Sequence, residues 1–174
     1  SALISGCHGT MPNFRRSCYR SSVQFQVGWT ESDSDAQEMC IKECLGLTGM
    51  GKIIVFATSI DVVNLLARRM DCQAVTSGIA IDFERFDRRR IIVASSCAGH
   101  GLDMKDIYAV PILGVPFDAE TLLQWAGGIR KSGIVKLFLN RRLVASLSRR
   151  NDRRGELAKV IVEAAENNIQ DACC

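Results

Sequence analysis

Small and hydroxyl-bearing residues follow a short apolar run in the middle of the chain. Residues 91–94 read Ile-Ile-Val-Ala, and they precede Ser95, Ser96 and a Gly-His-Gly-Leu-Asp stretch from Gly99 to Asp103. Serine hydroxyls can donate hydrogen bonds to phosphate oxygens, and glycine lets a backbone turn approach a ligand closely. The pattern predicts a phosphate- or nucleotide-binding turn after a strand. An ordinary connection between a strand and a helix is the alternative.

A strongly basic stretch lies further along, at residues 130–154. It carries nine lysine and arginine side chains against one acidic side chain, Asp152, which leaves a net charge of +8 within a chain whose total is +3. Such a block attracts phosphates. A solvated helix face or a basic loop explains the charge equally well.

Other chemistries lack residues at the required spacing. The nearest approach to a Walker A motif, 49–52, precedes an apolar run instead of following one. The two histidines, His8 and His100, pair with no recognisable nucleophile. Cys40 and Cys44 have the spacing of zinc ligands, but no second pair follows, so we expect packing residues and no bound metal. All eight cysteines are expected to be reduced thiols.

Length and composition bound the class of protein. The chain has 174 residues, 47% hydrophobic and 24% charged, which suits one domain with a proper core and excludes wholesale disorder. No apolar stretch reaches the length of a membrane span, and no secretory signal is visible at the start. The first residue is not Met, which suggests a fragment or a processed chain.

Strand and helix patterns alternate along the chain, which predicts an α/β fold with a parallel sheet. Expected strands cover 23–27, with one buried face, and 53–57, 91–94, 109–113 and 134–139. Expected helices cover 31–47, a segment capped by Thr58 and Asp61 that runs to Met70, and 119–126. In the first of these helices we expect four apolar members, Met39, Ile41, Cys44 and Leu45.

The C-terminal segment is expected to be one more helix, packed on the same domain. Its apolar stripe is expected to cover one face of the sheet, and its members are Leu157, Val160, Ile161, Ala164, Ala165 and Ile169. The expected organisation is therefore an irregular segment at 1–22, the main domain at 23–150 and the C-terminal helix at 151–174.

Two stretches together resemble the second RecA-like domain of superfamily 2 helicases, most of all RecQ-type DNA helicases. Residues 91–103 are similar to motif V, a strand that runs into a G-x-G-[IL]-D loop. Residues 124–133 are similar to motif VI, Q-x-x-G-R-x-G-R-x-G. Residues 51–58 resemble motif IV, and the resemblance covers roughly residues 1–140. It implies a RecA-like parallel sheet with helices on both faces, a three-layer sandwich.

The resemblance also implies roles for individual residues. Arg130 and Lys131 would be catalytic, acting on the γ-phosphate of ATP. The ATP, with its Mg held mainly by a first RecA-like domain outside this chain, would also contact Gly101, Asp103 and Gln124. The DNA backbone, as a single strand or an unwinding duplex, would contact Thr58, Ser95, Ser96, Arg141 and Arg142. Its partners would be DNA and that first domain, with no membrane, in an intracellular, nuclear location.

Departures from the family pattern open a second reading. Motif VI has arginine where this sequence has Gly128 and Lys131, and Lys131 keeps the charge without the bidentate fork. The paired cysteines of the RecQ zinc subdomain are missing, and the motifs of the first domain lie outside the chain. We therefore expect no ATP hydrolysis by this polypeptide alone. The alternatives are a helicase-like relic that serves as an interaction module and a stand-alone small-molecule α/β enzyme.

Overall fold

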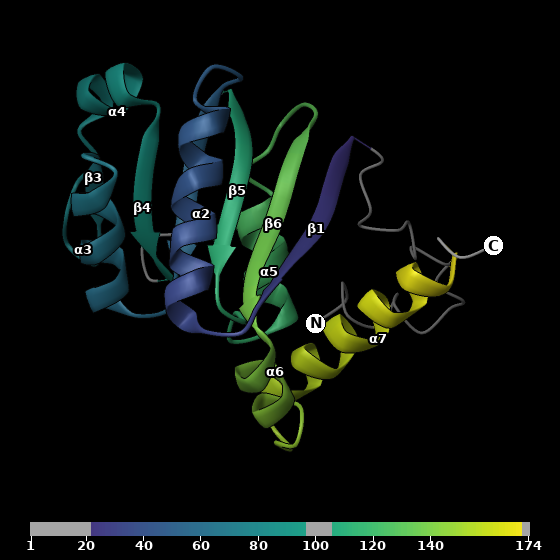
Figure 1. Ribbon diagram of the computed structural model, residues 1–174. Coiled ribbons are helices and arrows are strands. Elements are labelled where there is room, and N and C mark those ends of the chain that lie inside the picture. The colour runs from purple at the N-terminus through teal and green to yellow at the C-terminus, as the bar shows by residue number, and fades with distance from the viewer. Residues whose placement is uncertain (1–21, 97–105, 172–174) are drawn as a thin grey trace, which may run out of the picture.

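The computed structural model describes residues 22–96 and 106–171, and it contains a six-stranded, fully parallel sheet. The spatial order is β1-β6-β5-β2-β4-β3 (Figure 1). The strands are β1 (Val23–Thr30), β2 (Lys52–Ala57), β3 (Gln73–Val75), β4 (Ile91–Ser95), β5 (Ile107–Leu113) and β6 (Gly133–Asn140). The predicted α/β, RecA-like class is confirmed.

Helices cover both faces of the sheet, as a parallel sheet requires. They are α2 (Asp33–Leu47), α3 (Ile60–Arg69), α4 (Phe83–Arg89), α5 (Ala119–Ala126), α6 (Arg141–Leu147) and α7 (Arg153–Asp171). In Figure 1, α2 and α3 lie in front of the sheet, α5 lies behind it, and α6 and α7 lie below it. The predicted three layers are present.

Alternation along the central strands divides the core between the two faces. In β2, Ile53 and Val55 pack with α2 and α3, while Ile54 and Phe56 pack with α5. The ring of Phe56 stacks on that of Trp125 with 4.4 Å between centroids. This period of two is what strands buried on both faces produce.

The expected strands and helices are all present, and the structure adds three short elements that the sequence did not predict. These are β3, with three residues, and α4 and α6, with seven residues each. Segments of this length show too few turns or alternations to produce a periodic pattern. The additions matter because α6 carries two of the predicted nucleic-acid-binding arginines.

The helix after β2 begins one residue later than expected. Ser59, and not Thr58, is the N-cap of α3, and no side-chain hydrogen bond closes this cap. The expected capping box of Thr58 with Asp61 is therefore wrong. As a result, the Thr58 hydroxyl is not committed to the α3 backbone.

Two expected apolar faces are also wrong in part. Phe25 and Val27 are 44% and 36% exposed, because β1 is an edge strand that α5 does not reach. In α2 the buried side chains are Ala36, Cys40, Ile41 and Cys44, while Met39 and Leu45 are exposed. Ala36, Cys40 and Cys44 are spaced by four residues, so they lie on one face of the helix, and Ile41 lies next to them on the same side.

The C-terminal helix packs differently from the expectation. Leu157 and Ile161 are buried as predicted, but Val160 is 58% exposed and Ala164 is exposed. The helix packs mainly on α6 and α5, so it extends the core beyond the end of the sheet and does not cover a sheet face (Figure 1). The side chains of Ala165 and Ile169 lie outside the described part of the structure.

No helix among the described residues is long and apolar enough to cross a membrane.

Candidate nucleic-acid and nucleotide sites

The residues predicted to bind the nucleic-acid backbone lie at one edge of the sheet. Thr58 follows β2, Ser95 and Ser96 end and follow β4, and Arg141 and Arg142 follow β6. Because all strands are parallel, their carboxyl ends share one edge, the lower edge in Figure 1. We call this end of the sheet, formed by the last residues of the strands, the carboxyl edge, and the opposite end the amino edge. The structure thus brings together side chains that are more than 80 positions apart in sequence.

A small pocket opens at the centre of the carboxyl edge. Its volume is about 200 Å³, and its walls come from α2, α3, α6 and the ends of β2, β5 and β6. The floor is apolar, and the rim carries the side chains of Thr58, Ser59, Asp33, Gln37 and Asn140.

Gly114 keeps this pocket open beside Thr58. It has a φ of +88°, a backbone conformation that other residues rarely adopt, and a Cβ built on it would lie 3.8 Å from the Thr58 hydroxyl. The half-buried Thr58 hydroxyl therefore lies next to a position that carries no side chain.

Ser95 and Ser96 differ in accessibility. Ser95 ends β4 opposite Ala57 and is 6% exposed, whereas Ser96 is half-buried at the start of the connection that follows. Of the two hydroxyls, that of Ser96 is the more accessible to a ligand.

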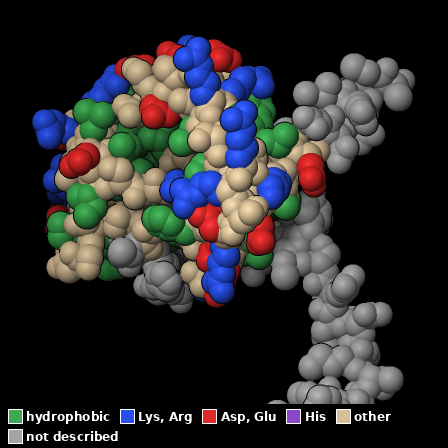
Figure 2. All heavy atoms as spheres, turned by 90° about the horizontal axis from the view of Figure 1, so that it is seen from below, with side chains coloured by type: hydrophobic (Ala, Val, Ile, Leu, Met, Phe, Trp, Pro, Cys, Tyr) green, Lys and Arg blue, Asp and Glu red, His purple; other side chains and the backbone are tan. Residues whose placement is uncertain are grey.

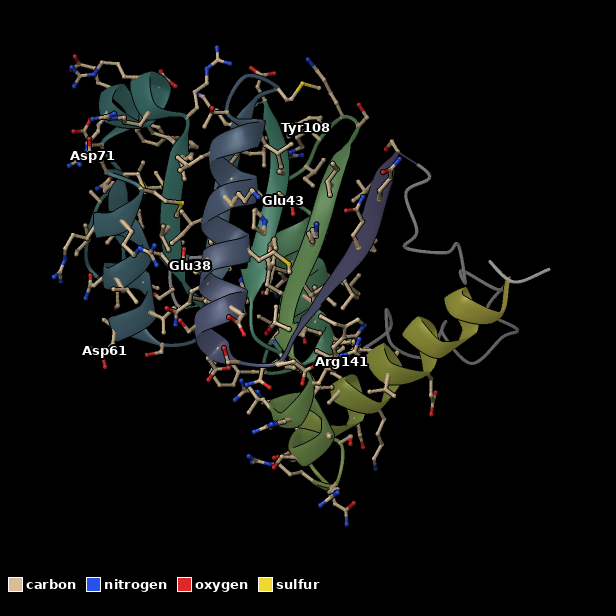
Figure 3. All side chains as sticks on the ribbon, viewed as in Figure 1. Glu38, Glu43, Asp61, Asp71, Tyr108 and Arg141 are labelled. Carbon is tan, nitrogen blue, oxygen red and sulfur yellow. The ribbon has the colours of Figure 1, made fainter. Side chains whose placement is uncertain are left out.

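Arg141 and Arg142 begin α6, beside the end of β1. The Arg141 guanidinium lies 5.2 Å from the Trp29 ring centre, and its Nε lies 3.4 Å from a Glu31 carboxylate oxygen. Figure 3 shows Arg141 at the lower end of the sheet. Arg142 has no ion pair with any residue that the structure describes, so its charge is available to a ligand.

The basic stretch 130–154 is divided by the fold. Part of its charge is neutralised within the fold, because Lys136 on β6 forms an ion pair with Glu43 on α2. Most of its arginines lie on α6, the α6–α7 connection and the start of α7. Figure 2, which views the molecule from below, shows many Lys and Arg side chains on this face, most of them at its centre and right, with Asp and Glu side chains among them. A cationic surface of this kind attracts phosphates.

Arg130 and Lys131 lie at the opposite end of the sheet, directly before β6. The Lys131 ammonium is 3.5 Å from a carboxylate oxygen of Asp106, which precedes β5, and the Lys131 side chain is 83% exposed. Figure 3 labels Tyr108 at this upper, amino edge, far from Arg141. Arg130 and Lys131 therefore lie at the opposite end of the sheet from Thr58, Ser96, Arg141 and Arg142.

Gln124 lies near the end of α5, which returns the chain toward the amino edge. Its amide nitrogen donates to a Glu120 carboxylate oxygen at 3.4 Å. Gly101 and Asp103, the other predicted ATP contacts, lie outside the described residues. Arg130, Lys131 and the Gln124 amide are suited to phosphate or ribose oxygens, but Gly128 supplies no side chain where motif VI has an arginine. The described amino edge therefore carries two cationic side chains and no arginine at position 128.

Gly133 is the last residue of the stretch that resembles motif VI, and it lies at a close contact between β6 and its neighbours. A Cβ on this residue would lie 2.3 Å from the Tyr108 carbonyl oxygen and 2.9 Å from Ile129 Cγ2. Strand β6 can pair with β5 only if this position lacks a side chain, which explains the terminal glycine of the motif.

Hydrogen bonds at the helix starts hold acidic side chains ionised near the arginines. The Thr121 hydroxyl and backbone N–H both donate to Asp118 and lower its pKa. The backbone N–H of Gly155 does the same for the pKa of Asp152. Burial lowers the pKa of Arg154, whose Nε donates to the Val115 carbonyl oxygen at 3.1 Å.

Three residues at the carboxyl edge were not predicted as functional. Gly114 directly follows β5 and Asn140 is the last residue of β6, and a glycine or amide after an apolar run is a signal that the sequence offered. Phe117 gave no signal, because an isolated aromatic residue after a proline reads as core.

No protein-family model matches the chain, and no curated protein does. Solved structures do resemble it. E. coli DEAD-box protein SrmB, in a complex with the regulator of ribonuclease activity A, superposes with a TM-score of 0.55 at 16% identity over 75% of this chain and 86% of the other.

Two further structures share the arrangement. A DEAD-box protein from Methanococcus jannaschii gives a TM-score of 0.58 at 15% identity over 73% of this chain, and the chain spans 38% of its length. Domain 2 of the DEAD-box helicase Mss116p, bound to an RNA duplex, gives 0.53 at 14% identity over 70% of this chain, which spans 56% of that structure. At these identities the likeness establishes the fold, which is the RecA-like fold of helicase domains.

Proposed function

We propose that this chain acts as the second motor domain of a superfamily 2 helicase and binds nucleic-acid backbone at its carboxyl edge. The observation that carries the proposal is the placement of Thr58, Ser96, Arg141 and Arg142 at that one edge, where Thr58 lines the pocket and the two arginines begin α6. Hydroxyl and guanidinium donors of this kind contact phosphates without reading sequence.

The finer assignment is to RecQ-type helicases that act on DNA, in the nucleus. It is supported by the motif V and motif VI stretches of the sequence. Since the three similar structures named above are all DEAD-box proteins and one of them holds an RNA duplex, RNA is the ligand to compare with DNA.

At the amino edge, Arg130, Lys131 and Gln124 would contact ATP held mainly by a first RecA-like domain. ATP would supply the free energy for movement along the strand. The role of this chain's own cations is to bind and orient the phosphates, which Lys131 can do from its exposed position beside Asp106.

The relic that serves as an interaction module is the second candidate function. It is favoured by Gly128, which provides no guanidinium, and by Lys131, which stands where motif VI has an arginine and lies beside the carboxylate of Asp106. On this reading the carboxyl edge binds nucleic acid and the amino edge performs no chemistry.

Binding is tested by a fluorescence anisotropy titration of the full chain with labelled single strands of about 16 nucleotides, as DNA and as RNA. We expect binding that weakens linearly with the logarithm of salt concentration, because counterions are released from phosphates. Tighter binding to DNA supports the RecQ-type assignment, and tighter binding to RNA contradicts it. Affinity that does not respond to salt contradicts the proposed backbone contact.

A measurement of ATP hydrolysis in the presence of a supplied first RecA-like domain distinguishes the motor domain from the relic. The motor reading predicts strand-stimulated hydrolysis by the unaltered chain, reduced by Lys131→Gln. The relic reading predicts none until Gly128→Arg and Lys131→Arg are introduced.

A further inference from the structure

Phe117 is an exposed aromatic residue at the carboxyl edge to which the proposed function assigns no role. It lies between the end of β5 and the start of α5 and is 47% exposed. A single exposed apolar residue is ordinary, and Leu123 on α5 is equally exposed at 48%. What distinguishes Phe117 is the set of arginines around it.

Arg154, from the first turn of α7, lies against the Phe117 ring. Its guanidinium carbon is 5.3 Å from the ring centre, and its Nε donates to the carbonyl oxygen of Val115 at 3.1 Å. Because that hydrogen bond ties the arginine to the chain two residues before the ring, guanidinium and ring are held in one arrangement. The ring is therefore supported on one side by a fixed cation.

Two more arginines flank this pair with largely exposed side chains. Arg153 lies 3.9 Å from an Asp118 carboxylate oxygen and remains 82% exposed, and Arg150 pairs with Asp152 at 2.5 Å and is 57% exposed. Asp118 caps α5 through Thr121, and Asp152 accepts from the Gly155 backbone. Both carboxylates thus have structural partners of their own, while the guanidinium groups extend into solvent.

We propose that Phe117 is a stacking platform for one unpaired base of a single strand, with the neighbouring phosphates held by Arg150 and Arg153. The proposal rests on the proposed nucleic-acid binding and adds a base contact to it. An aromatic ring beside a cationic surface is the combination that sequence-tolerant single-strand binders use, since every base has a π face. Bases inside a duplex are already stacked, so the platform selects single strands.

The test uses the full chain and a matched pair of truncations, Phe117→Ala and Leu123→Ala. Each variant is titrated with a single strand, with an abasic strand of the same length, and with inorganic polyphosphate. We expect Phe117→Ala to weaken binding of the intact strand by about 5- to 150-fold, the range of one base stacked on an aromatic ring. Its binding of the abasic strand and of polyphosphate should match the parent, as should all binding by Leu123→Ala.

A strand with one 2-aminopurine gives a direct readout. Stacking quenches its fluorescence, so we expect quenching by the parent and by Phe117→Trp and none by Phe117→Ala. Unchanged melting temperatures of the variants exclude loss of the fold as the cause.

The outcomes separate the platform from the backbone site. If Phe117→Ala binds the intact strand as the parent does, the platform is wrong while backbone binding stands. If Phe117→Ala weakens polyphosphate binding equally, the ring only positions Arg154, and the stacking role is overturned. If the parent binds neither strand nor polyphosphate, the proposed function itself fails.

Discussion

Gly133 shows how far one residue type can be understood at the residue scale. The motif VI resemblance placed a glycine here, and the structure supplies the reason: a Cβ would lie 2.3 Å from the Tyr108 carbonyl oxygen. By contrast, nothing in the sequence indicated that Arg154 would lie against Phe117, because the two are 37 positions apart and meet only through the packing of α7. Local chemistry was readable, and long-range pairing was not.

Replacing Gly133 by alanine should destabilise the protein, because β6 must move away from β5 to admit the methyl group. We expect a loss of about 1–3 kcal/mol in the free energy of unfolding, measured by urea denaturation. Gly46→Ala is the control: it lies inside α2 with nothing within 4 Å of the added Cβ, so it should leave stability equal or raised. Equal effects of the two substitutions would contradict the described β5–β6 contact.

Buried thiols make the stability of the fold depend on pH in the alkaline range. The hydrogen bond with Cys40 and burial raise the pKa of Cys44 well above the ordinary value of 9.0, and burial raises the pKa of Cys72 to about 12. A pKa raised in the folded state stabilises the protein fully below the unfolded value and progressively less above it.

Stability should therefore show no thiol contribution to its pH dependence below about pH 9 and should fall as pH rises from there toward 12. Urea unfolding between pH 7 and pH 11 measures this. In a Cys72→Ala variant the fall should be shallower. A slope identical to that of the parent would show that Cys72 is accessible to water as a thiolate.

At the element scale, periodicity predicted the long elements and missed the short ones. Strands β2 and β4 are buried on both faces and read as unbroken apolar runs, so they could be identified directly. For α7 the sequence indicated a helix but not its neighbours. Its expected stripe included Val160, which is 58% exposed, and omitted Ala158, which is fully buried, because the helix packs on α6 and α5.

A charge introduced at two adjacent residues of α7 should have very different effects on the free energy of unfolding. Ile161 is 7% exposed within the core cluster, so Ile161→Asp places an unpaired carboxylate among apolar side chains and should cost about 4 kcal/mol or more. Val160→Asp introduces the same charge at an exposed position and should change stability by less than about 0.5 kcal/mol. Thermal unfolding by circular dichroism compares the two, and a fully folded Ile161→Asp variant would mean that α7 does not dock as described.

At the scale of the whole molecule, the parallel sheet separates the described members of the two groups of predicted site residues. The sequence resemblance assigned one group to nucleic acid and the other to ATP, but it contained no information on their relative positions. Strand order and direction supply it: the connections after β2, β4 and β6 meet at the carboxyl edge, and those before β5 and β6 meet at the amino edge. The end at which each residue lies could be expected from its position before or after a parallel strand. The lateral order of the strands, which decides which connections are neighbours, is set by tertiary packing, and no local pattern predicted it.

The central claim is that the carboxyl edge, and not the amino edge, binds the nucleic-acid backbone. The most direct test compares Arg141→Gln/Arg142→Gln with Arg130→Gln/Lys131→Gln, two variants that each remove two positive charges. The measurement is the dependence of single-strand affinity on salt concentration. The carboxyl-edge variant should lose up to about 1.4 from the slope of log affinity against log salt, at about 0.7 per phosphate contact, while the amino-edge variant keeps the parent slope. The account would be contradicted if the carboxyl-edge variant kept the slope of the parent and the amino-edge variant showed a reduced slope.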